Sequence, residues 1–78
     1  MISEFDKVVL TEDIYASGLK VGDVGTIVMV HANGLGYEVE FIALNGETIA
    51  VETLTTNQIR TIKKGEIAHV RKVQTIDF

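Results

Sequence analysis

Strict alternation of apolar and acidic residues over residues 37–41 is the feature that most constrains the fold of this chain. Tyr37, Val39 and Phe41 alternate with Glu38 and Glu40. Successive side chains of a β-strand point to opposite faces of its sheet, so the apolar residues would face a core and the glutamates would face solvent. No stretch of the sequence sustains the 3.6-residue apolar period of a long helix. The pattern therefore predicts an all-β fold.

Other segments have the β-branched composition of strands. They are residues 5–10, 23–32 and 59–62, and a further strand is expected after a turn near Gly46. Apolar residues fall on both faces of the segment 23–32, which is typical of a strand that bends around a barrel corner, and Gly25 within it suits the bend. Residues 11–21 lack a regular period and predict a long loop. The sequence thus predicts about five short strands.

The turn between residues 41 and 48 has two readings. A two-residue Asn45-Gly46 turn would put Glu52 on the apolar face beside Val39. A three-residue loop, with Gly46 left-handed in a bulge, keeps that face apolar. We therefore expect the three-residue loop. The expected pairs are Phe41 with Ile49, Val39 with Val51, and Glu38 with Glu52.

Charge divides the chain into two parts. Residues 1–62 carry three basic and nine acidic residues, a net charge of −6, whereas residues 63–78 carry a net charge of +2. A chain of 78 residues is expected to form a single domain. We divide it into a small barrel over residues 1–62 and a C-terminal extension over residues 63–78. The β-branched residues of the extension favour an added strand, and its opposite charge favours folding back against the acidic barrel.

Composition narrows the environment in which the chain is expected to act. It contains no cysteine, so neither a disulfide framework nor a cysteine-rich zinc site is expected. Its apolar runs are far shorter than the roughly 20 residues of a membrane span, and its N-terminal residues do not resemble a targeting segment. We therefore expect a cytoplasmic protein with no membrane association. A hydrophobic content of 46% suggests that a partner or a second copy covers part of its surface.

One segment resembles a known motif. Residues 22–27, Gly-Asp-Val-Gly-Thr-Ile, look like the Gly-Asp-x-Gly-Thr-Val pattern of KOW and related SH3-like modules. Taken with residues 8–11, 37–41, 46–50 and 54–60, the chain resembles domain-of-unknown-function family 4926, a group of small bacterial and often cyanobacterial proteins. The resemblance covers roughly residues 4–62. It implies an SH3-like small barrel with no established activity. The residues themselves indicate that Gly22, Gly25 and Gly46 serve the fold, because a strand and not a helix N-terminus follows Gly22, which argues against a phosphate-binding loop.

Catalysis has little support in the sequence. The two histidines, His31 and His69, are far apart, and no cysteine nucleophile is present. Glu38 and Glu40 would lie about 7 Å apart on one strand face, which is near the spacing of paired glycosidase carboxylates. They are expected on a solvated face without an aromatic platform for a sugar. We therefore expect no enzyme activity, no catalytic residues, no metal site and no cofactor.

The remaining hypotheses concern binding. The leading one is a non-enzymatic protein-interaction module, a small regulator of immunity or antitoxin type, that meets an unknown protein partner through acidic residues. The predicted partner-binding residues are Glu38, Glu40, Glu47 and Glu52, and Glu12 and Asp13 are expected to extend the same acidic strip.

The alternative is a KOW-like nucleic-acid or ribosome-associated module that uses the basic residues of the extension. The net charge of −4 makes nucleic-acid binding the weaker hypothesis. We also expect a homodimer formed through residues 63–78, because the extension is apolar and β-prone.

Overall fold

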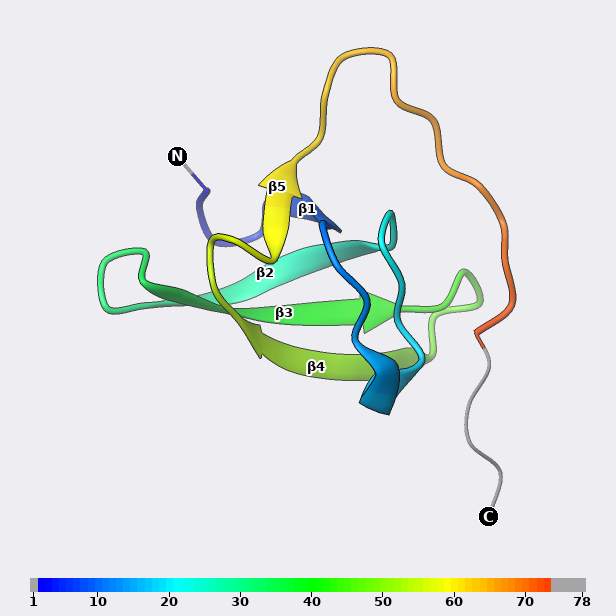
Figure 1. Ribbon diagram of the computed structural model, residues 1–78, viewed down its shortest axis with the longest axis horizontal. Coiled ribbons are helices and arrows are strands. Elements are labelled where there is room, and N and C mark those ends of the chain that lie inside the picture. The colour runs from blue at the N-terminus through cyan, green and yellow to red at the C-terminus, as the bar shows by residue number, and fades with distance from the viewer. Residues whose placement is uncertain (1, 74–78) are drawn as a thin grey trace.

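The computed structural model describes residues 2–73, which fold into one antiparallel sheet of five strands (Figure 1). The elements are β1 (Lys7–Leu10), the 3₁₀ turn η1 (Tyr15–Ser17), β2 (Val24–His31), β3 (Gly36–Ile42), β4 (Thr48–Leu54) and β5 (Ile59–Thr61). The strands lie in the order β4-β3-β2-β1-β5, so β1 joins β5 to the meander formed by β2, β3 and β4. The fold is all-β, as the sequence predicted, and is consistent with a small SH3-like barrel.

One face of the sheet is buried as a continuous apolar core. In β3, Tyr37, Val39 and Phe41 are buried, whereas Glu38 and Glu40 between them are not, which confirms the predicted alternation. The other core residues come from the remaining strands and the first loop, and they are Val8, Leu10, Leu19, Ile27, Leu54 and Ile59. Full burial of an aliphatic or aromatic side chain contributes about 1.5–3 kcal/mol before the loss of conformational entropy, so this cluster holds the five strands together.

The start of β2 approaches β3 very closely at Gly25. A Cβ atom at this position would lie 2.5 Å from Cγ1 of Val39 and 2.8 Å from Cε2 of Phe41. Further along β2 a bulge at Val28 interrupts the pairing with β3. The bulge explains why apolar residues alternate irregularly in this strand, because it turns Met29 away from the core.

The β3–β4 hairpin has the predicted three-residue loop. The amide of Ala43 donates to the carbonyl of Glu47 at 2.8 Å, and the amide of Gly46 donates to the carbonyl of Ala43 at 2.9 Å. Gly46 has a φ of +96°, a left-handed conformation that glycine adopts without steric cost. The loop therefore consists of residues 44–46.

The register beyond this loop differs from the prediction. Ile42 pairs with Thr48, but an extra residue in β4, Ile49, then shifts every following pair by one position. The expected pairs are wrong: Phe41 lies opposite Ala50 instead of Ile49, Val39 opposite Glu52 instead of Val51, and Glu38 opposite Thr53 instead of Glu52. The shift brings Glu52 to the core side of the sheet, where the Ser17 hydroxyl donates a hydrogen bond to its carboxylate. This contact offsets part of the cost of moving a charged group out of water.

The C-terminal extension leaves β5 and runs along the outside of the molecule (Figure 1). We expected it to add a strand, but residues 63–73 form none, and residues 74–78 lie outside the described part of the chain. Two ion pairs hold the extension instead, Arg60 with Glu66 at its start and Arg71 with Asp23 near its end. The basic extension thus folds back onto the acidic barrel, as the opposite charges led us to expect.

Candidate interaction surface

Glu38 and Glu40 lie on the side of the sheet that faces away from the core. Glu40 pairs with Thr26 of β2 and Val51 of β4, and directly opposed residues point to the same side of a sheet. Glu38 pairs in the same way with Met29 and Thr53. We call this surface the outer face, and it comprises Thr26, Met29, Glu38, Glu40, Ile42, Val51 and Thr53.

Hydrogen bonds orient both glutamates of the outer face. Oε2 of Glu38 accepts a hydrogen bond from Oγ1 of Thr53 at 2.6 Å and lies 2.9 Å from Nε2 of His31. These contacts lower the pKa of Glu38 below its ordinary value of 4.5, with the Thr53 hydrogen bond as the larger cause. Glu40 accepts a hydrogen bond from Oγ1 of Thr48 at 3.0 Å. Both carboxylates are therefore oriented, and Glu38 stays ionised well below neutral pH.

Apolar side chains surround the two carboxylates on the same face. Met29, Ile42 and Val51 have exposed fractions of 50%, 48% and 52%. A partner that covers them would remove apolar area from water, which is worth about 25 cal/mol per Å². The outer face thus combines oriented negative charge with apolar area that is still open to solvent.

The other acids of the predicted partner-binding set do not belong to this face. Glu47 follows the β3–β4 loop, and Glu52 is on the core side of β4. Glu12 and Asp13 lie in the loop between β1 and η1. Of the four glutamates named from the sequence, the structure brings together only the two on β3.

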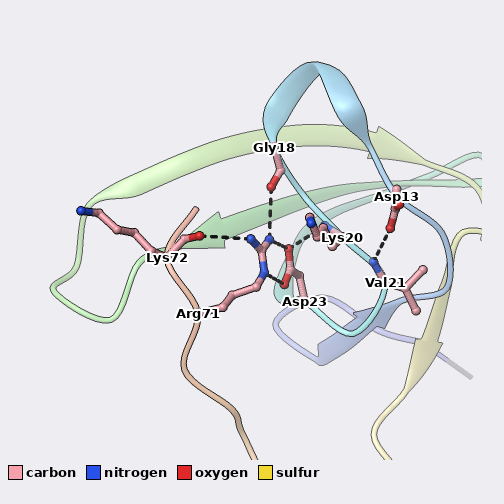
Figure 2. Close-up of polar contacts among 7 residues, drawn as sticks. All are labelled: Asp13, Gly18, Lys20, Val21, Asp23, Arg71 and Lys72. Carbon is pink, nitrogen blue, oxygen red and sulfur yellow. Dashed lines mark hydrogen bonds and ion pairs between the residues drawn. The ribbon is translucent and has the colours of Figure 1, made fainter. Parts of the chain in front are cut away.

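Arg71 fastens the extension to the start of β2 and the first loop (Figure 2). Its Nε donates to Oδ1 of Asp23 at 2.9 Å, and its Nη2 donates to Oδ2 of the same carboxylate and to the carbonyl of Gly18 at 3.2 Å. Asp23 also accepts the backbone amide of Lys20 at 2.8 Å. A two-point contact between a guanidinium and a carboxylate is stronger and more directional than a single ion pair. The hydrogen bond with Asp23 raises the pKa of Arg71.

This contact was not predicted residue by residue. Asp23 drew attention only as part of the Gly-Asp-x-Gly segment, and the one signal for its role was the charge contrast between barrel and extension. The contact also bears on the nucleic-acid hypothesis, because the positive charge of Arg71 is already matched by a carboxylate. A polyanion would find less uncompensated charge on the extension than the sequence indicates.

One histidine contacts the outer face: among the described residues, Nε2 of His31 lies 2.9 Å from Oε2 of Glu38. Within residues 2–73, no three His, Asp or Glu side chains are grouped so as to hold a metal ion. No helix in the same part of the chain is long and apolar enough to cross a membrane.

These features define a small all-β domain whose distinctive chemistry lies on its surface. Residues 4–61 match the family described as Domain of unknown function (DUF4926), and the chain belongs to that family. The match confirms the family resemblance found in the sequence, and it stops before the extension. The chain has no significant match among curated proteins or among solved structures.

Proposed function

We propose that this chain is a non-enzymatic protein-interaction module that binds its partner through the outer face. The observation that carries the proposal is the presence of Glu38 and Glu40 among the exposed side chains of Met29, Ile42 and Val51. Carboxylates on a surface attract a basic partner and speed its association, while buried apolar area supplies affinity once contact is made. A partner surface with both basic and apolar side chains fits this face.

The partner would be a larger protein with a basic functional surface. A chain of 78 residues with a net charge of −4 is suited to cover such a surface, which is the role of a small regulator of immunity or antitoxin type. We place this role in the cytoplasm, because the chain has no cysteine and needs no oxidising compartment. The role requires neither a cofactor nor a metal.

Affinity capture from native lysate tests the proposal. The bait is the wild-type chain, and the test variant is Glu38→Gln/Glu40→Gln, which removes both charges and keeps the shape of the outer face. The wild type should retain a stoichiometric partner that the variant loses. Opposite charges speed the diffusional encounter of the two proteins, and salt screens those charges. The association rate constant of the purified pair should therefore fall as the salt concentration increases.

A matched control separates the outer face from net charge. The variant Glu4→Gln/Glu12→Gln removes the same number of charges at two positions outside β2, β3 and β4, and it should retain the partner. Equal capture by the two double variants would contradict the proposed site. Failure of the wild type to retain any stoichiometric protein would contradict the proposed function.

A further inference from the structure

Residues 67–70 form an arm that is fixed at both ends and open between them. At the first end, Glu66 accepts two hydrogen bonds from Arg60, at 2.9 and 2.6 Å. At the second end, Arg71 is bound to Asp23. Between these anchors Ile67 has an exposed fraction of 92% and Val70 one of 74%. The two anchors therefore restrict the arm before a partner binds, which lowers the conformational entropy lost on binding, and the apolar side chains of the arm remain exposed to water.

β4 offers a strand edge to which such an arm could pair. It is the last strand at one end of the sheet and, among the described residues, pairs only with β3. In an antiparallel ladder the end strand directs alternate backbone N–H and C=O groups away from its neighbour. The sequence of β4, Thr-Ile-Ala-Val-Glu-Thr-Leu, contains neither lysine nor proline, two of the residues that protect an edge from pairing. The bulge at Ile49 limits pairing at the start of the strand, so the regular edge consists of residues 50–54, where the one charged side chain, Glu52, is bound to Ser17. Val51, in its middle, is half exposed.

The arm does not pair with the β4 edge of its own sheet. It starts from β5, which lies at the opposite end of the strand order from β4. Its second anchor, Asp23, immediately precedes β2. With both anchors made, residues 63–73 pair with no strand of their own sheet, so the strand edge that we propose for the arm belongs to another molecule.

Charge favours a second copy as the source of that edge. Lys64 and Lys72 flank the arm, whereas Glu47 and Glu52 lie just before and within β4. Arg71 is already matched by a carboxylate of its own chain, whereas Lys64 and Lys72 form no ion pair among the described residues, so their charges can meet the acidic barrel of the other copy. A two-fold axis would let each copy give its arm and receive its partner's arm, so that two equivalent contacts close the dimer.

We propose that residues 67–70 add as a short strand to the free edge of β4 in a second copy of this chain. In this contact the backbone N–H and C=O groups of the arm form hydrogen bonds with those at the edge of β4, and the second copy covers Ile67 and Val70. It uses the edge of the sheet and the arm, and does not depend on the partner proposed for the outer face.

Sedimentation equilibrium over a concentration series tests the dimer. The wild type should approach twice the 8.6 kDa mass of one chain as concentration rises. The variant Ile67→Asp/Val70→Asp should stay monomeric with an unchanged circular dichroism spectrum, since both side chains are exposed. The matched control is Leu35→Asp, a change at a 77% exposed apolar residue in the β2–β3 turn, which should leave the dimer intact. A wild type that remains monomeric at the highest soluble concentration overturns the proposal, as does a dimer that survives the double variant.

Cross-linking between copies tests the site. The chain has no cysteine of its own, so single-cysteine variants Ala68→Cys in the arm and Val51→Cys in β4 can be mixed and treated with a short bismaleimide. We expect a cross-linked dimer that contains one chain of each variant. Heterodimers no more abundant than those formed by an Ala68→Cys and Leu35→Cys mixture would overturn the arm-to-edge contact. Neither assay requires the partner of the outer face. Failure of the dimer proposal would therefore leave the proposed function to be tested by capture, and failure of capture would leave the dimer to be tested by these assays.

Discussion

Gly25 shows how a single residue sets the distance between two strands. The missing side chain leaves room for Val39 and Phe41 of β3, which pack where a Cβ atom would otherwise lie. Gly25 is itself buried, so the side chain of a larger residue could not avoid these neighbours by moving into solvent. The requirement at this position is for space, and it differs from that at Gly46, where the requirement is a left-handed backbone.

Gly25→Ala should therefore destabilise the fold. Adding a methyl group to a filled core typically costs about 1–3 kcal/mol, and urea denaturation should show a loss of this size. Gly36→Ala is the matched control, because a Cβ atom there would meet its nearest neighbour, Cβ of His31, at an ordinary 3.8 Å. Its free energy of unfolding should stay the same or rise by up to about 1 kcal/mol, since alanine loses less backbone entropy than glycine. Equal losses in the two variants would contradict the steric explanation.

Glu66 gives a prediction for pH. Its pKa is lowered from the ordinary 4.5 to about 2, chiefly by the hydrogen bonds from Arg60 and then by the backbone amide of Lys63. Because the folded-state pKa is the lower one, this carboxylate stabilises the turn at pH values above 4.5 and loses that effect as the pH falls toward 2. An NMR titration of the Glu66 side-chain carboxyl carbon should have its midpoint near 2, and Arg60→Gln should move it toward 4.5. A midpoint that does not change in the variant would show that Arg60 is not the cause.

At the scale of the elements, local pattern predicted the strands but not how they pair. The alternation in β3 is visible in the sequence because a strand with one buried face must show it. The register of β4 is not, because the bulge at Ile49 places Glu52 beside Ser17, a residue 35 positions away. The same limit applies to the outer face. Its glutamates follow from the alternation, but the contacts of Glu38 with His31 and Thr53 depend on bulges in the neighbouring strands.

The extension lacks the expected strand over residues 63–73 for a related reason. Its β-branched residues favour a strand locally, but its path is set by the contact of Arg71 with Asp23, 48 residues earlier in the chain. Sequence pattern carries no information on which acid an arginine will meet, only that the two parts of the chain have opposite charge. The sequence therefore predicted that the extension folds back onto the barrel, but it did not predict the contact between Arg71 and Asp23 that holds it there.

Arg71→Gln should release the extension without unfolding the barrel. Because both partners of this ion pair are partly exposed, the loss in the free energy of unfolding should be no more than about 1 kcal/mol. The local effect should be larger, since opening of a segment depends on its own contacts. A protease that cuts beside large apolar residues should cleave near Ile67 and Val70 several times faster in the variant. Lys72→Gln, which removes the same charge from the neighbouring residue, should leave the cleavage rate near that of the wild type, and equal acceleration in both would contradict the role of Arg71.

At the scale of the whole molecule, the core is filled by the sheet's own apolar side chains and the distinctive chemistry remains outside. The acidic barrel and the basic extension are joined at Asp23, so part of the charge is matched within one chain. What is left over is the outer face on one side of the sheet, and the arm and the β4 edge at its margins. The outer face offers side chains and the β4 edge offers backbone groups, with Val51 common to the two, and the two proposals together have one small chain hold both a partner and a second copy.

A chemical-shift map of the complex tests the central claim most directly. The amide spectrum of the labelled chain would be recorded while the partner obtained by capture is added. The outer-face account predicts that the largest shifts fall in β2, β3 and β4, at and around Met29, Glu38, Glu40 and Val51, with little change in the first loop. Shifts confined to residues 11–21 or to residues 63–73, with the outer face unchanged, would contradict it.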